Sequence, residues 1–123
     1  MPEDQNRCVI SVGTLPELLS LREAVLKSVG YEVFTTVRPQ DALSRIRERS
    51  CAVLLLCYSV PAEWRKQLIQ EFRQDCPHGR IVAITDRIVA EIPKQVDELI
   101  FGLEGAEALI NAIRGGASNS TIT

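Results

Sequence analysis

The sequence lacks any apolar run long enough to cross a membrane and any cluster of basic charge. Its longest apolar run extends only from Ala52 to Tyr58, far short of the roughly 20 residues that a membrane helix needs. The start, Met1 to Arg7, is polar, so we expect no signal peptide. The net charge is -2, and Arg45, Arg47 and Arg49 alternate with other residues, as on a solvated helix face. These features predict a cytoplasmic location without membrane or nucleic-acid partners.

The sequence also has few residues that could bind a metal ion. Its single histidine is His78, and its four cysteines, Cys8, Cys51, Cys57 and Cys76, form no CxxC pair. Cys76 and His78 are close in sequence, but two ligands do not make a zinc site. Because cytoplasmic chains rarely carry disulfides, we interpret Cys8 and Cys51 as small buried apolar residues.

What the sequence does contain is a regular alternation of strand and helix patterns over 123 residues, which predicts one domain. The predicted strands are Cys8–Val12, Tyr31–Thr36, Ala52–Cys57, Arg80–Thr85 and Glu98–Phe101. The predicted helices are Leu15–Val29, with Thr14 as N-cap, Pro39–Arg49, Pro61–Gln74 and Glu104–Arg114. The segment 86–96 is ambiguous between a short helix and a loop.

This alternation predicts an α/β fold, because strands joined by helices form parallel sheets through right-handed crossovers. Five strands in a chain of this length favour a flavodoxin-like three-layer sandwich with strand order 2-1-3-4-5. Its ligand crevice lies beyond the carboxyl ends of the strands. The residues predicted there are Gly13, Thr14, Cys57, Tyr58, Thr85, Asp86 and Gly102.

The predicted crevice has little chemistry to offer. One glycine follows the first strand where a dinucleotide fingerprint has three, and no Walker sequence is present. Asp86 is the only carboxylate near the crevice, which makes a poor Mg²⁺ site. Cys57 would need a base to become a nucleophile, and His78 precedes the fourth strand, at the opposite end of the sheet. We therefore expect no enzymatic activity, no metal and no cofactor.

Three segments resemble response-regulator receiver domains. "VGTLPELLSLREAVLKSVGYEV" is similar to their first strand, first helix and second strand, and "CAVLLLCYSVP" to the third strand that carries the phosphoacceptor aspartate. "IVAITD" resembles the fourth strand, which ends in a Thr or Ser that contacts the phosphoryl group, here Thr85. The resemblance covers about Arg7 to Arg114. It implies a module of two-component phosphorelay signalling, in which a histidine kinase phosphorylates the aspartate with Mg²⁺.

The chain departs from the family pattern at the positions that perform this chemistry. The metal-binding acidic pair falls on Gly13 and Thr14, and the phosphoacceptor on Cys57, or on Leu56 in the alternative register. The lysine of the fifth strand falls on Gly102. Without these charged groups nothing stabilises the phosphoryl group in transfer. The resemblance therefore implies a degenerate receiver, or pseudo-receiver, whose fourth helix, between Thr85 and Gly102, is short.

We expect a flexible N-terminus over residues 1–6, a receiver-like domain over 7–114 and a flexible tail over 115–123. The leading hypothesis is that the domain acts by protein–protein interaction without phosphorylation, through a protein partner that the sequence does not name or through a second copy as a homodimer. A redox sensor based on the Cys57 thiol is the alternative. A small flavin-binding enzyme is a third hypothesis, weakened by the absence of an acid–base pair in the crevice.

Overall fold

The computed structural model describes residues 7–85, 95–101 and 105–115. Its centre is a five-stranded parallel sheet in the order β2-β1-β3-β4-β5, which confirms the predicted order. The strands are β1 (Cys8–Val12), β2 (Glu32–Thr36), β3 (Val53–Cys57), β4 (Arg80–Thr85) and β5 (Glu98–Phe101).

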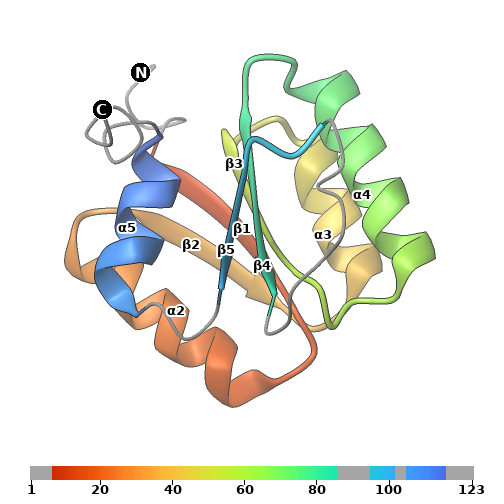
Figure 1. The fold of residues 1–123 in the computed structure, drawn as a ribbon. Coiled ribbons are helices and arrows are strands. Elements are labelled where there is room, and N and C mark those ends of the chain that lie inside the picture. The colour runs from red at the N-terminus through yellow and green to blue at the C-terminus, as the bar shows by residue number, and fades with distance from the viewer. Residues whose placement is uncertain (1–6, 86–94, 102–104, 116–123) are drawn as a thin grey trace.

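Helices cover both faces of this sheet (Figure 1). The helices are α2 (Pro16–Ser28), α3 (Pro39–Arg47), α4 (Ala62–Asp75) and α5 (Ala106–Arg114). Helices α3 and α4 pack on one face, and α2 and α5 pack on the other. The flavodoxin-like three-layer sandwich is thereby confirmed.

The core has two parts, one on each face of the sheet, and β3 contributes to both. Leu54 and Leu56 pack under α3 and α4, whereas Val53 and Leu55 pack under α2 and α5. Successive side chains of a strand point to opposite faces, so a strand covered on both sides must be apolar throughout. This explains the unbroken apolar run that the sequence shows here.

Helix α2 differs from the prediction at its start and on its surface. Its N-cap is Leu15, with no side-chain capping bond, rather than Thr14. Pro16 begins the helix, which suits a residue without a backbone N–H. Of its leucines, Leu19 and Leu26 are buried, whereas Leu18 and Leu21 are 40% and 61% exposed. The helix thus presents apolar side chains to the surface as well as to the core.

The interpretation of Cys8 and Cys51 as unpaired cysteines was wrong. Both are buried, as expected, but the structure joins them by a disulfide between residues 43 apart in sequence. Cys8 begins β1, and Cys51 precedes the neighbouring strand β3, which brings their Cα atoms to 4.5 Å. That separation lies within the range that a disulfide spans. Spacing in the sequence gives no sign of such a pairing across strands.

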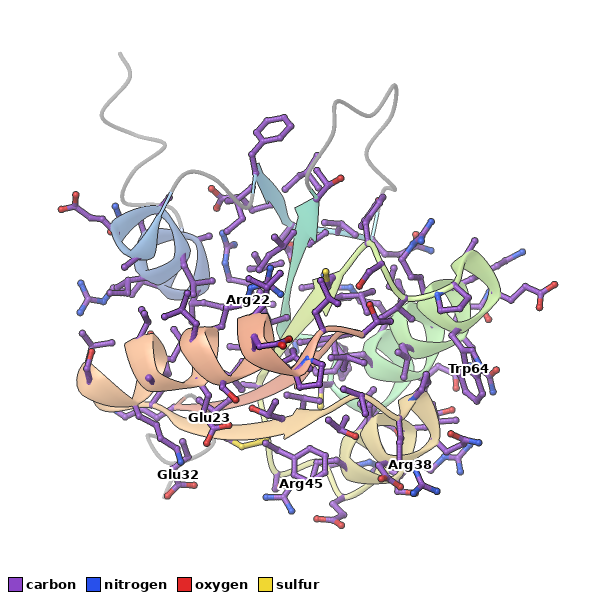
Figure 2. All side chains as sticks on the ribbon, turned by 90° about the horizontal axis from the view of Figure 1, so that it is seen from below. Arg22, Glu23, Glu32, Arg38, Arg45 and Trp64 are labelled. Atoms are coloured by element: carbon purple, nitrogen blue, oxygen red, sulfur yellow. A yellow bond between two sulfur atoms is a disulfide. The ribbon has the colours of Figure 1, made fainter. Side chains whose placement is uncertain are left out.

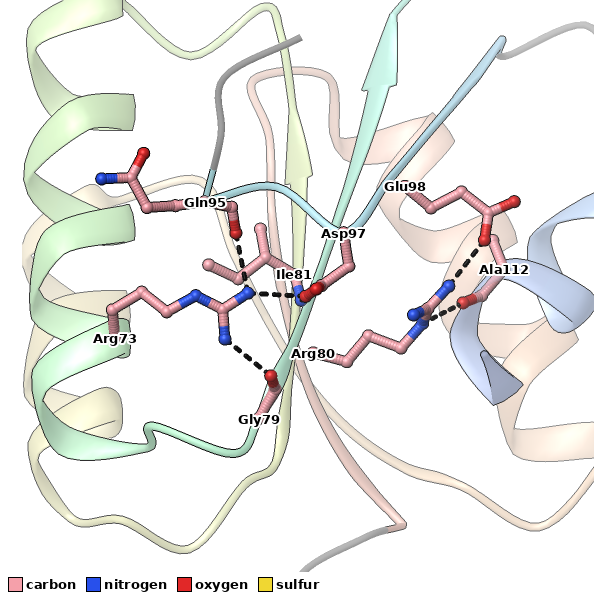
Figure 3. Close-up of polar contacts among 8 residues, drawn as sticks. All are labelled: Arg73, Gly79, Arg80, Ile81, Gln95, Asp97, Glu98 and Ala112. Carbon is pink, nitrogen blue, oxygen red and sulfur yellow. Dashed lines mark hydrogen bonds and ion pairs between the residues drawn. The ribbon is translucent and has the colours of Figure 1, made fainter. Parts of the chain in front are cut away.

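The amino edge of β4 and β5 is held by Arg73 and Arg80 (Figure 3). Arg80 donates to Glu98 Oε1 and to the carbonyl oxygen of Ala112. Arg73 of α4 donates to the carbonyl oxygens of Gly79 and Gln95 and to the carboxylate of Asp97, each at 2.6 to 2.7 Å. The same carboxylate accepts a hydrogen bond from the backbone N–H of Ile81. These contacts attach the segment before β5 to α4 and to the start of β4, and so fix where β5 enters the sheet.

Several predicted features lie outside the described residues. These are the N-terminus over 1–6, the tail from residue 116 onward, the ambiguous segment over 86–94, and Asp86 and Gly102 of the predicted crevice. The short helix expected between Thr85 and Gly102, which is not α4, also falls largely within this group. Among the helices that the structure describes, none has the length and apolar character to span a membrane.

Candidate functional site

The carboxyl ends of β1 and β3 lie side by side and form the centre of the candidate site. Gly13 follows β1, and Cys57 is the last residue of β3. A Cβ atom built on Gly13 would lie 3.3 Å from Cys57 Cβ. Leu56, the alternative phosphoacceptor position, is buried in the core under α3 and α4 instead. Of these two residues of β3, Cys57 is therefore the one that borders Gly13.

Leu19 of α2 fills the space next to Gly13. The same Cβ built on Gly13 would lie 3.1 Å from Leu19 Cδ2, and the Leu19 side chain is 2% exposed. Contacts this short mean that even a methyl group at residue 13 requires its neighbours to move. The packing thus leaves little room for a side chain at residue 13, in addition to the absence of acidic residues.

The Cys57 thiol lies in a polar and positively charged environment. Burial acts to raise the pKa of Cys57, but a hydrogen bond from Ser59 Oγ at 3.1 Å and the Arg22 guanidinium outweigh it and hold the pKa below its ordinary value. Arg22 comes from α2 and lies on the opposite side of that helix from Glu23 (Figure 2). Helix α2 therefore supplies both an apolar plug, Leu19, and a cation to the site.

The turn after β3 is held by a second arginine. Arg65 of α4 donates to the carbonyl oxygens of Tyr58 at 3.1 Å and Val60 at 2.7 Å. Its guanidinium also lies 4.3 Å from the centre of the Tyr58 ring, a cation–π contact. The turn is thereby fixed to α4, and another positive charge stands near the carboxyl end of β3.

Two further site residues are described: Thr14, which is exposed before α2, and Thr85, which ends β4 and is 3% exposed. None of the described residues predicted for the crevice carries a carboxylate. No group of three or more His, Cys, Asp or Glu side chains suited to a metal ion occurs in the described ranges. The charged side chains identified around Cys57 are arginines, which repel Mg²⁺ rather than bind it.

The sequence analysis missed Leu19, Arg22 and Arg65. The sequence carried a signal for Leu19 and Arg22, because residues three apart share a helix face. Their helix is the one that directly follows the first strand. Arg65 gave no signal, because its partners are backbone carbonyl groups. Packing also places His78 at the amino edge of the sheet, away from Cys57, so no Cys–His pair forms.

The two unpaired cysteines are expected to differ in reactivity. Burial and Asp75 raise the pKa of Cys76, whereas the pKa of Cys57 is lowered. Both thiols are half-buried, so the thiolate fraction should decide the rate. At pH 7 we expect iodoacetamide to alkylate Cys57 several times faster than Cys76, as followed by peptide mass spectrometry. An Arg22→Gln variant should be alkylated more slowly at Cys57 and at an unchanged rate at Cys76. Equal alkylation rates of the two thiols in the wild-type chain would contradict the lowered pKa of Cys57.

Comparison with solved structures relates this architecture to known proteins. A response regulator from Burkholderia pseudomallei with a phosphorylated aspartic acid and a calcium ion superposes with a TM-score of 0.79 and 15% identity, over 94% of this chain and 71% of that one. A signal receiver domain of a putative LuxO repressor from Vibrio parahaemolyticus superposes with a TM-score of 0.77 and 13% identity, over 94% of this chain and 93% of that one. The chain has the receiver-domain fold. A receiver domain from Clostridium thermocellum adds a TM-score of 0.76 at 17% identity, over 94% and 97%.

The receiver fold is thus evident from structure where sequence similarity is low. No protein-family model and no curated protein sequence matches the chain. Identities this low establish the fold and leave function to the site itself. In this receiver fold, the carboxyl ends of β1 and β3 carry Gly13 and Cys57, closed by Leu19.

Proposed function

We propose that the chain is a receiver-like module of two-component signal transduction that has lost phosphorylation and acts in the cytoplasm by protein–protein interaction. It has no enzymatic activity, metal or cofactor of its own in this proposal. The observation that carries it is the packing around Gly13, where a Cβ atom would lie 3.1 Å from Leu19 Cδ2 and 3.3 Å from Cys57 Cβ, so that an acidic side chain would require its neighbours to shift. An intact receiver fold around a filled site supports a role that depends on the surface of the domain.

The chemistry of the site supports the same proposal. Phosphoryl transfer to a receiver needs a carboxylate acceptor, a bound cation and groups that stabilise the spread negative charge. Gly13, Thr14 and Cys57 supply neither the acceptor nor ligands for the cation. Thr85 remains at the end of β4, but one hydroxyl cannot replace the carboxylate acceptor and the ligands of the cation.

An apolar groove between α2 and α5 offers a surface for a partner. It is a cavity of about 170 Å³, and its lining includes Leu18 and Leu21 of α2, Phe101 of β5 and Leu109 of α5. Leu18, Leu21 and Phe101 are 40%, 61% and 39% exposed. Exposed apolar side chains gathered around one groove are typical of interaction sites. The partner in this proposal is a protein or a second copy of the chain.

An amide NMR titration tests the loss of phosphorylation. Mg²⁺ and then beryllofluoride, which mimics an aspartyl phosphate, are added to the wild-type chain and to a Cys57→Asp variant. We expect no saturable shift at Gly13, Thr14, Cys57 or Thr85 in the wild type. The variant regains only the acceptor carboxylate, so we expect no saturable shifts in it either, because no pair of carboxylates binds the metal. Saturable shifts of these residues in the wild type would refute the proposal.

The same spectra also test the interaction surface. In a dilution series, concentration-dependent shifts at Leu18, Leu21 and Phe101 would identify the groove as a homodimer contact. Spectra that do not change with concentration would exclude self-association over the range measured and leave a different protein as the partner. Shifts confined to residues far from the groove would contradict its role.

A thiol sensor remains the second candidate, because Ser59 and Arg22 lower the pKa of Cys57. A sensor needs a thiolate that reacts quickly with peroxide and is restored by a thiol reductant. The test compares the peroxide oxidation rate of Cys57 in the folded chain with that of the same thiol in urea. A folded rate no higher than the unfolded one would end this candidate.

A further inference from the structure

A basic cavity lies at the amino edge of the sheet, at the opposite end from Cys57. Its volume is about 500 Å³. Four basic side chains from separate parts of the chain line it: Arg7 before β1, His78 and Arg80 at the start of β4, and Arg114 at the end of α5. Among the residues that the structure describes, none of those that line the cavity is acidic.

The base of this cavity is a rigid part of the fold. The carbonyl oxygen of Arg7 accepts a hydrogen bond of 2.7 Å from the backbone N–H of Glu32, and that of Ala52 accepts one of 2.8 Å from Arg80. These bonds extend the sheet pairing beyond the strand ends. Apolar side chains complete the lining: Val29, Tyr31, Val53 and Ile113. Arg7 and Arg80 therefore project from backbone that the sheet pairing holds in place.

The charges in the cavity are only partly balanced. Arg80 is paired, since it donates to Glu98 Oε1 and to the carbonyl oxygen of Ala112, both at 2.6 Å (Figure 3). Within the described ranges, Arg7 and Arg114 have no carboxylate partner. A Cβ on Gly30 would lie 2.8 Å from Arg7 Nη1, so the Arg7 guanidinium lies directly over Gly30.

Several terminal carbonyl groups of the helices that end at this edge accept hydrogen bonds from groups other than these two arginines. Helix C-termini carry partial negative charge, which often explains basic residues beside them. Here the terminal carbonyl groups of Leu26 and Lys27 in α2 already accept backbone hydrogen bonds. In α5, Asn111 accepts one from the backbone N–H of Gly115, and Ala112 accepts the bond from Arg80. Among the described residues, none supplies a carboxylate to balance Arg7 or Arg114 at this cavity.

We propose that this cavity binds a small phosphorylated anion, held by Arg7 and Arg114 with His78 beside them. Guanidinium groups match phosphate oxygens through paired hydrogen bonds, and a phosphate group balances the charge of two arginines. The apolar lining leaves room for a small organic body attached to the phosphate. The proposal concerns the amino edge alone and does not depend on what occurs at Cys57.

Isothermal titration calorimetry at low ionic strength, in a buffer without phosphate, tests this site with inorganic pyrophosphate and with adenosine monophosphate. We expect saturable binding, weakened about tenfold in Arg7→Gln and in Arg114→Gln, as for the loss of one charge-assisted pair. Arg38→Gln is the matched control, because Arg38 is an exposed arginine outside the cavity, and should bind as the wild type does. Tighter binding of the nucleotide than of pyrophosphate would show that the organic part contributes.

Two further variants keep the test decisive if a glutamine variant fails to fold. Arg7→Lys and Arg114→Lys retain the charge but not the paired geometry, so we expect an intermediate loss of affinity. The proposal is overturned if neither probe binds saturably up to millimolar concentration. It is also overturned if the variants of Arg7 and Arg114 bind as well as Arg38→Gln.

Discussion

A chain carrying Gly13→Asp is expected to lose about 2 to 4 kcal/mol of its free energy of unfolding, measured by urea denaturation. Two effects add. A Cβ at residue 13 would lie 3.1 Å from Leu19 Cδ2 and 3.3 Å from Cys57 Cβ, so its neighbours must shift to admit a side chain. The carboxylate would also enter a buried position, where a charge loses its hydration. The acidic residue that a working receiver needs is therefore one that this packing opposes.

Thr14→Asp is the matched control for this experiment. Thr14 is the next residue and is exposed, so the variant adds the same charge without overpacking or burial. We expect it to change the free energy of unfolding by less than about 0.5 kcal/mol. Gly13→Asp as stable as Thr14→Asp, or a Gly13→Asp chain that binds Mg²⁺ tightly, would show that packing does not close the site, and the observation that carries the proposed loss of chemistry would fail.

Removal of the Cys8–Cys51 disulfide, in a Cys8→Ala, Cys51→Ala chain, is expected to lower the free energy of unfolding by about 2 to 4 kcal/mol. The disulfide closes a loop between residues 43 apart, and a cross-link over a loop of that length restricts the unfolded chain considerably. Urea denaturation with and without reductant checks this. Reductant should destabilise the wild-type chain and have no effect on the double variant.

Cys76→Ala serves as the control, because Cys76 is outside the disulfide. Its chain should keep its sensitivity to reductant. A thiol count on denatured, unreduced protein should give two free thiols per chain, those of Cys57 and Cys76; a count of four would contradict the disulfide. If the disulfide is retained when thiols are trapped in the cells that make the protein, an oxidising compartment is indicated and the proposed cytoplasmic location fails.

The fold could be predicted because its signals are local. The apolar run from Ala52 to Cys57 marked a central strand covered on both faces, and β3 is that strand, Val53–Cys57. The second helix begins at Pro39, as predicted, and ends at Arg47, two residues before the predicted end. Alternation of such segments leaves few topologies, because crossovers between parallel strands are right-handed. Element ends shifted by a few residues, as where the last helix begins at Ala106 rather than Glu104.

The candidate site was predictable in position but not in content. Strand order alone brings the ends of β1 and β3 together, so the proximity of Gly13 and Cys57 follows from topology. That Leu19 fills the space and Arg22 lowers the pKa of Cys57 depends on how α2 is rotated against the sheet. The sequence pattern placed Leu18, Leu19 and Leu21 alike among the apolar residues of this helix and did not indicate that only Leu19 would be buried.

By itself the sequence determined the alternation of strands and helices, the single parallel sheet and the absence of carboxylates from Gly13, Thr14 and Cys57. Only the tertiary structure decided the Cys8–Cys51 disulfide, the closure of the crevice by Leu19 and the basic cavity around Arg7 and Arg114. The physical reason is the range of the interactions. Periodicity and turn residues act within a few positions of the chain, whereas these three features join segments that meet only when helices pack on the finished sheet.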